Sequence, residues 1–207
     1  MNADDVFINC PFSSDYDSHF KAIVFTVIRS GFNPRCTRED ADDGHVRYDK
    51  ICKIIAECKF GVHDISYTGL YGDPQQDPDF PLPRFNMPLE LGLFLGAKRF
   101  DKTQSEKRLL IFDRDEFRFQ KFISDLSGQD IHFHQNDIKQ LIVKLAAWLR
   151  AATRRTTVPG GEAIANEHGD FVAELPSILE NLALDIGEVS YHDFVWLAKE
   201  WISQRQA

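Results

Sequence analysis

The chain has 207 residues, of which 43% are hydrophobic and 12% aromatic, and its formal net charge is −8 at pH 7. This length suits one α/β domain with a small appendage, and the apolar content is enough for a packed core, which excludes a disordered protein. The acidic balance argues against nucleic acid as a partner, because a nucleic-acid groove needs clustered Lys and Arg side chains to replace the counterions of the phosphates.

Short apolar runs alternate with amphipathic helical patterns up to residue 150, which is typical of a parallel sheet flanked by helices. In chain order the predicted units are strand 6–9 with helix 16–30, strand 33–36 with helix 46–58, strand 60–65 with helix 88–98, strand 108–112 with a helical stretch near 116–125, and strand 131–134 with helix 136–150. The predicted fold class is therefore α/β, with a flavodoxin-like parallel sheet of about five strands.

The composition changes after the last of these helices. A run rich in Thr, Arg, Pro and Gly indicates a linker, and two apolar helical patterns follow it at 170–184 and 191–203. The predicted organisation is an α/β domain, a linker and a C-terminal helical pair, at 1–152, 153–169 and 170–207 respectively.

The C-terminal helical pair cannot form a core by itself, because two helices of this length bury too little apolar surface. We therefore expect the pair to dock on the main domain or on a partner, which would be a second copy of the chain or another protein. Trp196 and Trp201 are the expected anchors for either arrangement. Ser190 and Asp193 give an N-terminal capping signal for the second helix.

Several features indicate a cytoplasmic protein without a membrane partner. No stretch approaches the ~20 apolar residues of a membrane span, and the polar residues 1–5 do not begin a signal peptide. The cysteines show no CxxC pairing and no metal-ligand spacing with histidine, which is typical of reduced, mostly buried thiols. These cysteines are Cys10, Cys36, Cys52 and Cys58. We expect neither a bound metal nor a bound cofactor.

Polar residues gather where the predicted strands end. In an open parallel sheet, ligands bind outside the carboxyl ends of the strands, near the point where strand order reverses. Asn9 ends the first predicted strand with Phe12 just beyond it, and Asp64 lies at the end of the third. Arg84 and Asn86 lie close to the start of the helix predicted at 88–98. These residues converge on one edge of the sheet if the predicted topology is right.

Glu90 is the strongest candidate for chemistry at this edge. Pro88 suits the first position of a helix, which places Glu90 at the third position, near the positive end of the helix dipole. Free N–H groups there should favour the carboxylate and lower its pKa. An ionised acid suits a nucleophile, or a group that stabilises an oxocarbenium-like sugar. The alternative is an ordinary first-turn glutamate that only complements the dipole.

Other charged residues leave two interpretations open. Asp64 could contact a ribose hydroxyl or simply fix the edge of the sheet. Arg47 could meet a phosphate or pair with Asp43 or Asp49. A short basic run near the end of the helix predicted at 136–150 is typical of a solvated helix end, and it consists of Arg150, Arg154 and Arg155. No GxGxxG, GxxxxGK[ST] or GxSxG motif is present, so a conventional dinucleotide, P-loop or hydrolase site is not expected.

Two motifs in this order resemble the superfamily that joins Toll/interleukin-1 receptor (TIR) domains with nucleoside 2-deoxyribosyltransferases. The opening run 6–12 (VFINCPF) is similar to the first strand and loop of both groups. The run 86–92 (NMPLELG), followed by 96–98 (GAK), resembles the helix that carries the catalytic glutamate of the superfamily. The resemblance covers roughly residues 5–150. Two departures are Asn86, where the transferases usually have an acidic residue, and the long 67–85 loop, which is short in a typical TIR domain.

The resemblance implies a catalytic role for Glu90 and a substrate pocket around it. The residues predicted to bind substrate are Asn9, Phe12, Asp64, Arg84 and Asn86. In a TIR-like NADase, Glu90 would stabilise the ribose as nicotinamide leaves, whereas in a deoxyribosyltransferase it would attack C1′. The leading hypothesis is an N-glycosidase acting on NAD or a related nucleotide, and bacterial TIR-like proteins of this kind commonly act in antiphage defence.

Two alternatives to the leading hypothesis remain open. One is base exchange on a nucleoside or nucleotide, as in the transferases. The other is a non-catalytic signalling module that binds a nucleotide or assembles with itself, for which the Trp-bearing C-terminal helices would supply the contact surface.

Overall fold

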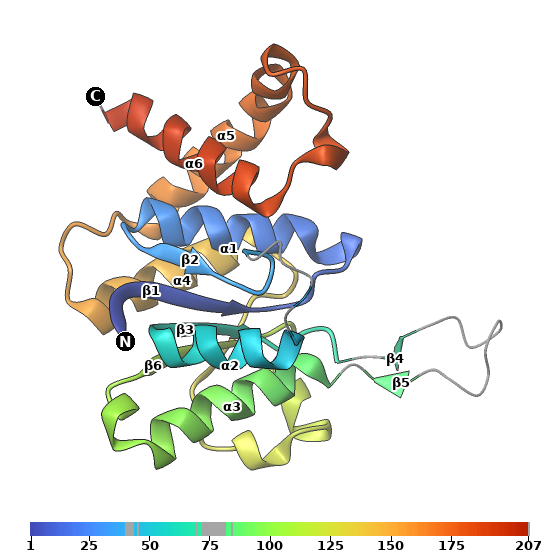
Figure 1. Cartoon of the computed structure of the whole chain (residues 1–207), viewed down its shortest axis with the longest axis vertical. Coiled ribbons are helices and arrows are strands. Elements are labelled where there is room, and N and C mark those ends of the chain that lie inside the picture. The colour runs from blue at the N-terminus through green and yellow to red at the C-terminus, as the bar shows by residue number, and fades with distance from the viewer. Residues whose placement is uncertain (40–43, 45, 69, 72–81, 84, 207) are drawn as a thin grey trace.

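Figure 1 shows the computed structural model of the chain, which describes residues 1–207 except 40–43, 45, 69, 72–81, 84 and 207. The helices are α1 (Asp17–Arg29), α2 (Arg47–Glu57), α3 (Asn86–Phe100), α4 (Ile138–Thr153), α5 (Gly161–Asn181) and α6 (Tyr191–Gln206). The main sheet contains β1 (Asn2–Asn9), β2 (Asn33–Arg35), β3 (Cys58–Asp64), β6 (Arg108–Asp113) and β7 (Ile131–Phe133). A separate antiparallel pair joins β4 (Leu70–Tyr71) to β5 (Leu82–Pro83).

The main sheet has the order β2-β1-β3-β6-β7, and all its neighbouring strands run parallel. This is the flavodoxin-like order, in which the direction of strand progression reverses between the first and third strands of the chain. The predicted fold class is confirmed. The reversal lies between β1 and β3, so the loops that follow these two strands border the expected position of a ligand.

The strands are apolar because helices cover both faces of the sheet. Val6 and Ile8 of β1 join the core cluster that lies beneath α1 and α4, whereas Phe7 joins the cluster formed with α2 and α3. Figure 1 shows the resulting layers, with α2 and α3 on one side of the sheet and α1 and α4 on the other. No helix among the described residues combines the length and apolarity that a membrane crossing requires.

Helices α5 and α6 dock on the main domain, over the layer formed by α1 and α4 (Figure 1). The ring of Phe25 in α1 stacks on Phe171 of α5 at 5.3 Å between centroids and meets the edge of Trp201 of α6 at 6.0 Å. Arg29 of α1 also forms an ion pair with Glu167 of α5. Trp201 is therefore an anchor within the chain, whereas Trp196 is 52% exposed.

The linker predicted at 153–169 is much shorter in the structure, because α5 already begins at Gly161. A Cβ atom built on Gly161 would lie 2.5 Å from the Cα atom of Val143 in α4. This glycine therefore permits close packing of two helices, so part of the sequence signal that indicates a linker reflects steric contact instead.

The helical stretch predicted near 116–125 is also different in the structure. Two short 3₁₀ turns occupy it, at Arg118–Lys121 and Ser124–Leu126. Phe117 has a left-handed φ of 58°, which interrupts a regular helix before it can begin. Arg118 then holds the segment against the sheet, because it donates hydrogen bonds to the Asp113 carboxylate and to the backbone oxygen of Ile65.

Candidate active site at the carboxyl edge of the sheet

A pocket of about 490 Å³ opens beside Glu90, where the strand order reverses. This volume falls within the range of small-molecule sites. Three segments build the pocket, namely the loop after β1, the first residue of α2 and the start of α3. The lining residues are Cys10, Pro11, Phe12, Ser13, Ser14, Asp15, Arg47, Asn86, Met87 and Glu90.

Glu90 lies deeper in its helix than the sequence predicted. The prediction began the helix at Pro88, but α3 begins at Asn86, so Pro88 is its third residue and Glu90 its fifth. Proline is tolerated throughout the first turn because the N–H groups there have no intrahelical partner. Glu90 is consequently beyond the turn whose free N–H groups would bind a carboxylate, and no described residue donates a hydrogen bond to its side chain.

The pKa of Glu90 is raised by burial from 4.5 to about 7, and the nearby positive charge of Arg47 opposes this rise. The predicted lowering of the pKa is therefore wrong. Only 8% of the residue is exposed, and the helix dipole weakens beyond the first turn, so the loss of solvation dominates. A carboxyl group with a pKa near 7 exists in both protonation states at neutral pH and can serve in acid–base or nucleophilic chemistry.

Asn9 ties the start of α3 to the centre of the sheet. It is buried, its Nδ2 atom donates a hydrogen bond to the backbone oxygen of Met87 at 2.8 Å, and the same atom lies 3.0 Å from Nδ1 of His63. Burial lowers the pKa of His63 to about 3, so this imidazole is neutral at physiological pH and can accept the hydrogen bond. Asn9 thus fixes the helix turn that precedes Glu90, and its amide hydrogens point at the protein.

Phe12 forms part of the pocket wall, and Arg38 holds it there. The Arg38 guanidinium carbon lies 4.6 Å from the centroid of the Phe12 ring, and its Nη2 donates a hydrogen bond of 2.9 Å to the Phe12 backbone oxygen. This cation–π contact and hydrogen bond restrict the ring. Ser13, which follows, has a buried Oγ that finds no partner among the described residues.

Asp64 lies in a buried network and does not line the pocket. Tyr16 donates a hydrogen bond to its carboxylate, the backbone N–H of Ser66 donates another at 2.8 Å, and Nε2 of His134 lies 3.1 Å from Oδ2. Nδ1 of His134 accepts the backbone N–H of Asn136, which assigns the ring proton to Nε2. Burial alone would raise the pKa of Asp64, but the hydrogen bonds outweigh it and the pKa lies below its usual value.

The structure brings together Phe12, Asn86 and Glu90 from the predicted set, while Asn9 supports the wall from behind. Arg84 lies outside the described residues. Arg47 lines the pocket, a position that the sequence left open between a phosphate contact and a structural pair. Cys10 was not predicted in the site. Burial, and next the charge of Asp64, raise the pKa of its thiol, so the thiol stays protonated.

Neither models of protein families, nor curated proteins, nor solved structures give a match to the chain. Within the described part of the chain, no three His, Cys, Asp or Glu side chains gather as a metal site would require.

Proposed function

We propose that this protein is an N-glycosidase that cleaves the bond between ribose and base in NAD or a related nucleotide. The observation that carries the proposal is the Glu90 carboxyl group, which is buried in the wall of a 490 Å³ pocket at the strand-order reversal and has no hydrogen-bond donor among the described residues. A buried carboxylate that receives no hydrogen bond from the protein is available to bind a substrate. The resemblance of the run 86–92 to the catalytic helix of the TIR and transferase superfamily supports the same role.

The chemistry needs only one carboxylate when the leaving base is nicotinamide. In NAD the C1′–N bond joins ribose to a positively charged pyridinium ring, so its electron pair returns to the ring and neutral nicotinamide leaves without a proton. Ionised Glu90 stabilises the positive charge that develops on the sugar. Water then adds at C1′ and releases its proton to solvent. Arg47, at the start of α2, contacts the phosphates of the substrate.

The test is incubation of the purified chain with NAD, NADP and several nucleosides, followed by chromatography of the products. We expect release of nicotinamide by the wild type and a loss of at least about 10³-fold in Glu90→Gln. Glu116→Gln is the matched control, because Glu116 is exposed and distant in sequence from every residue of the pocket. Normal turnover by Glu90→Gln would overturn the proposal.

The same assay distinguishes the two alternatives. Transfer of ribose to an added free base, rather than to water, would identify base exchange. Tight binding of the nucleotide without turnover, unaffected by Glu90→Gln, would identify a non-catalytic signalling module.

A further inference from the structure

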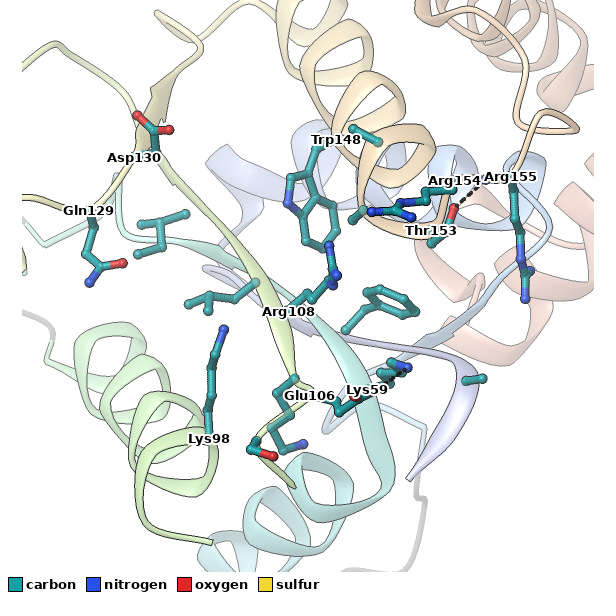
Figure 2. A pocket seen from close by; sticks show the side chains of 18 residues that line it. Lys59, Lys98, Glu106, Arg108, Gln129, Asp130, Trp148, Thr153, Arg154 and Arg155 are labelled. Atoms are coloured by element: carbon teal, nitrogen blue, oxygen red, sulfur yellow. Dashed lines mark hydrogen bonds and ion pairs between the residues drawn. The ribbon is translucent and has the colours of Figure 1, made fainter. Parts of the chain in front are cut away.

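A second and larger depression lies at the opposite, amino edge of the sheet, where β3 and β6 begin (Figure 2). We call it the basic basin. Its volume is about 1120 Å³, and its charged lining is predominantly cationic. The cationic side chains are Lys59, Lys98, Lys107, Arg108, Arg154 and Arg155, and the acidic ones are Glu106 and Asp130.

Three of the six cations have partners within the fold. Lys59 pairs with Glu106 at 3.3 Å, and Arg155 pairs with Asp4. The ammonium group of Lys107 is buried and donates hydrogen bonds to the backbone oxygens of Ile55 and Cys58 at the end of α2. The remaining three, Lys98, Arg108 and Arg154, make no side-chain hydrogen bond or ion pair with any residue that the structure describes.

The three cations without such a partner come from different elements and line the same depression. In Figure 2, Lys98 extends upward from α3, Arg108 lies at the start of β6, and Arg154 reaches across from the end of α4 toward the Trp148 indole. Like charges repel one another at short range. Three cations around one depression, in a chain with a net charge of −8, indicate a place for an external anion.

The helix dipole explains only part of this arrangement. Lys98 lies in the last turn of α3 and Arg154 follows the last turn of α4, where a cation is favourable in any protein. Arg108, however, opens a strand and has no helix end to complement. The dipole also does not require side chains from two helices to point into one depression.

We propose that the basic basin binds a polyphosphate anion, such as the phosphate chain of a nucleoside triphosphate. Arg108 and Arg154 offer planar forks that match pairs of phosphate oxygens, and Lys98 adds a point charge. Trp148, which is half-buried, supplies an aromatic wall at the same depression. Because the basin and the Glu90 pocket lie at opposite edges of the sheet, this binding does not depend on the proposed glycosidase activity.

Calorimetric titration of the full chain with inorganic tripolyphosphate and with ATP, in buffer free of divalent cations, tests the proposal. We expect saturable binding that weakens at least about tenfold in Arg108→Glu and, independently, in Lys98→Glu. Arg99→Glu is the matched control, because Arg99 is exposed on the same helix as Lys98, changes the net charge equally and does not line the basin. It should retain affinity within about twofold.

The two ligands separate the sources of affinity. Equal affinities would assign binding to the phosphate chain alone, and tighter binding of ATP that Trp148→Leu removes would add a contact with the base. Absence of saturable heat with both ligands would overturn the proposal. Equal weakening by Arg99→Glu and Arg108→Glu would also overturn it, as would saturable binding of a short single-stranded RNA but of neither polyphosphate.

Discussion

Two acids lie buried near the carboxyl edge of the sheet, and their surroundings are opposite. Asp64 has no exposed surface, receives hydrogen bonds from Tyr16 and Ser66, and contacts His134. Glu90 is 8% exposed, has no donor among the described residues and faces a pocket. Burial raises both pKa values, but only Asp64 has the donors that reverse the effect. The presence of hydrogen-bond donors therefore distinguishes Asp64, which stabilises the fold, from Glu90, which is available for chemistry.

The largest expected effect comes from removing the better-partnered acid. Asp64→Ala should lower the free energy of unfolding by about 3–5 kcal/mol, because it leaves the buried Tyr16 hydroxyl and the Ser66 backbone N–H without an acceptor. His134 loses its contact with the carboxylate as well, although the Ser66 Oγ atom still lies 2.9 Å from its Nε2 atom. Chemical denaturation at neutral pH measures this change. Asp64→Asn, which keeps an acceptor oxygen, should cost less. A near-normal unfolding midpoint combined with lost turnover would instead make Asp64 a substrate contact, as the sequence also allowed.

Glu90→Gln should change stability in the opposite direction. Because the folded protein holds the Glu90 proton more tightly than the unfolded chain does, the contribution of Glu90 to stability is most favourable below a pH of 4.5 and falls as the pH rises toward about 7. A neutral glutamine avoids this loss, so the variant should be more stable than the wild type at pH 8, by up to about 3 kcal/mol.

Denaturation of Glu90→Gln and wild type at pH 5 and pH 8 measures the effect, with Glu116→Gln as the exposed control. The difference between the two proteins should shrink to about 1 kcal/mol or less at the lower pH. A destabilised Glu90→Gln at pH 8 would mean that the carboxylate has a structural partner, and the contrast with Asp64 would fail.

The third effect concerns the position of Glu90 rather than its charge. Asn9→Ala removes the hydrogen bond to the Met87 backbone oxygen and frees the first turn of α3. A small displacement of a catalytic group can cost about 10²-fold in rate. We expect kcat to fall by about 10- to 100-fold while KM changes little, as steady-state kinetics on NAD would show. A rise in KM with unchanged kcat would make Asn9 a substrate-binding residue, as the resemblance implied.

The sequence predicted the sheet well because strands buried on both faces must be apolar. Each main strand lies within a few residues of its predicted position, and β3 (Cys58–Asp64) is an example. Predictions were weaker where tertiary contacts decide. Gly161 follows a Pro-Gly run that indicates a linker. In the structure Gly161 is the first residue of α5, and its lack of a side chain allows α5 to pack closely against Val143. Phe117 adopts a left-handed conformation that no local sequence pattern predicts.

The candidate site shows the same division between local and distant information. The run 86–92 identified Glu90, because a carboxylate near a proline-bearing helix start is a local signal. Its pKa could not be predicted, since a change of two residues in the helix start moves the side chain away from the free N–H groups. The hydrogen-bond network of Asp64 could not be predicted either. His134 follows Asp64 by seventy positions, and the two come together only when β7 pairs with β6.

The smallest expected effect comes from Arg47, whose positive charge lowers the pKa of Glu90. If turnover requires the carboxylate, kcat should rise with pH through about 7 in the wild type. Arg47→Gln removes the opposing charge, so this rise should move to higher pH, by roughly half a pH unit or less because Arg47 is exposed and screened. High salt should shift the pH profile of the wild type in the same direction and that of the variant much less.

Lys53→Gln is the control, because Lys53 is an exposed cation on α2 that does not line the pocket, and it should leave the pH profile unchanged. An unshifted profile with a raised KM would show instead that Arg47 serves the substrate phosphates alone, and that burial by itself sets the pKa of Glu90.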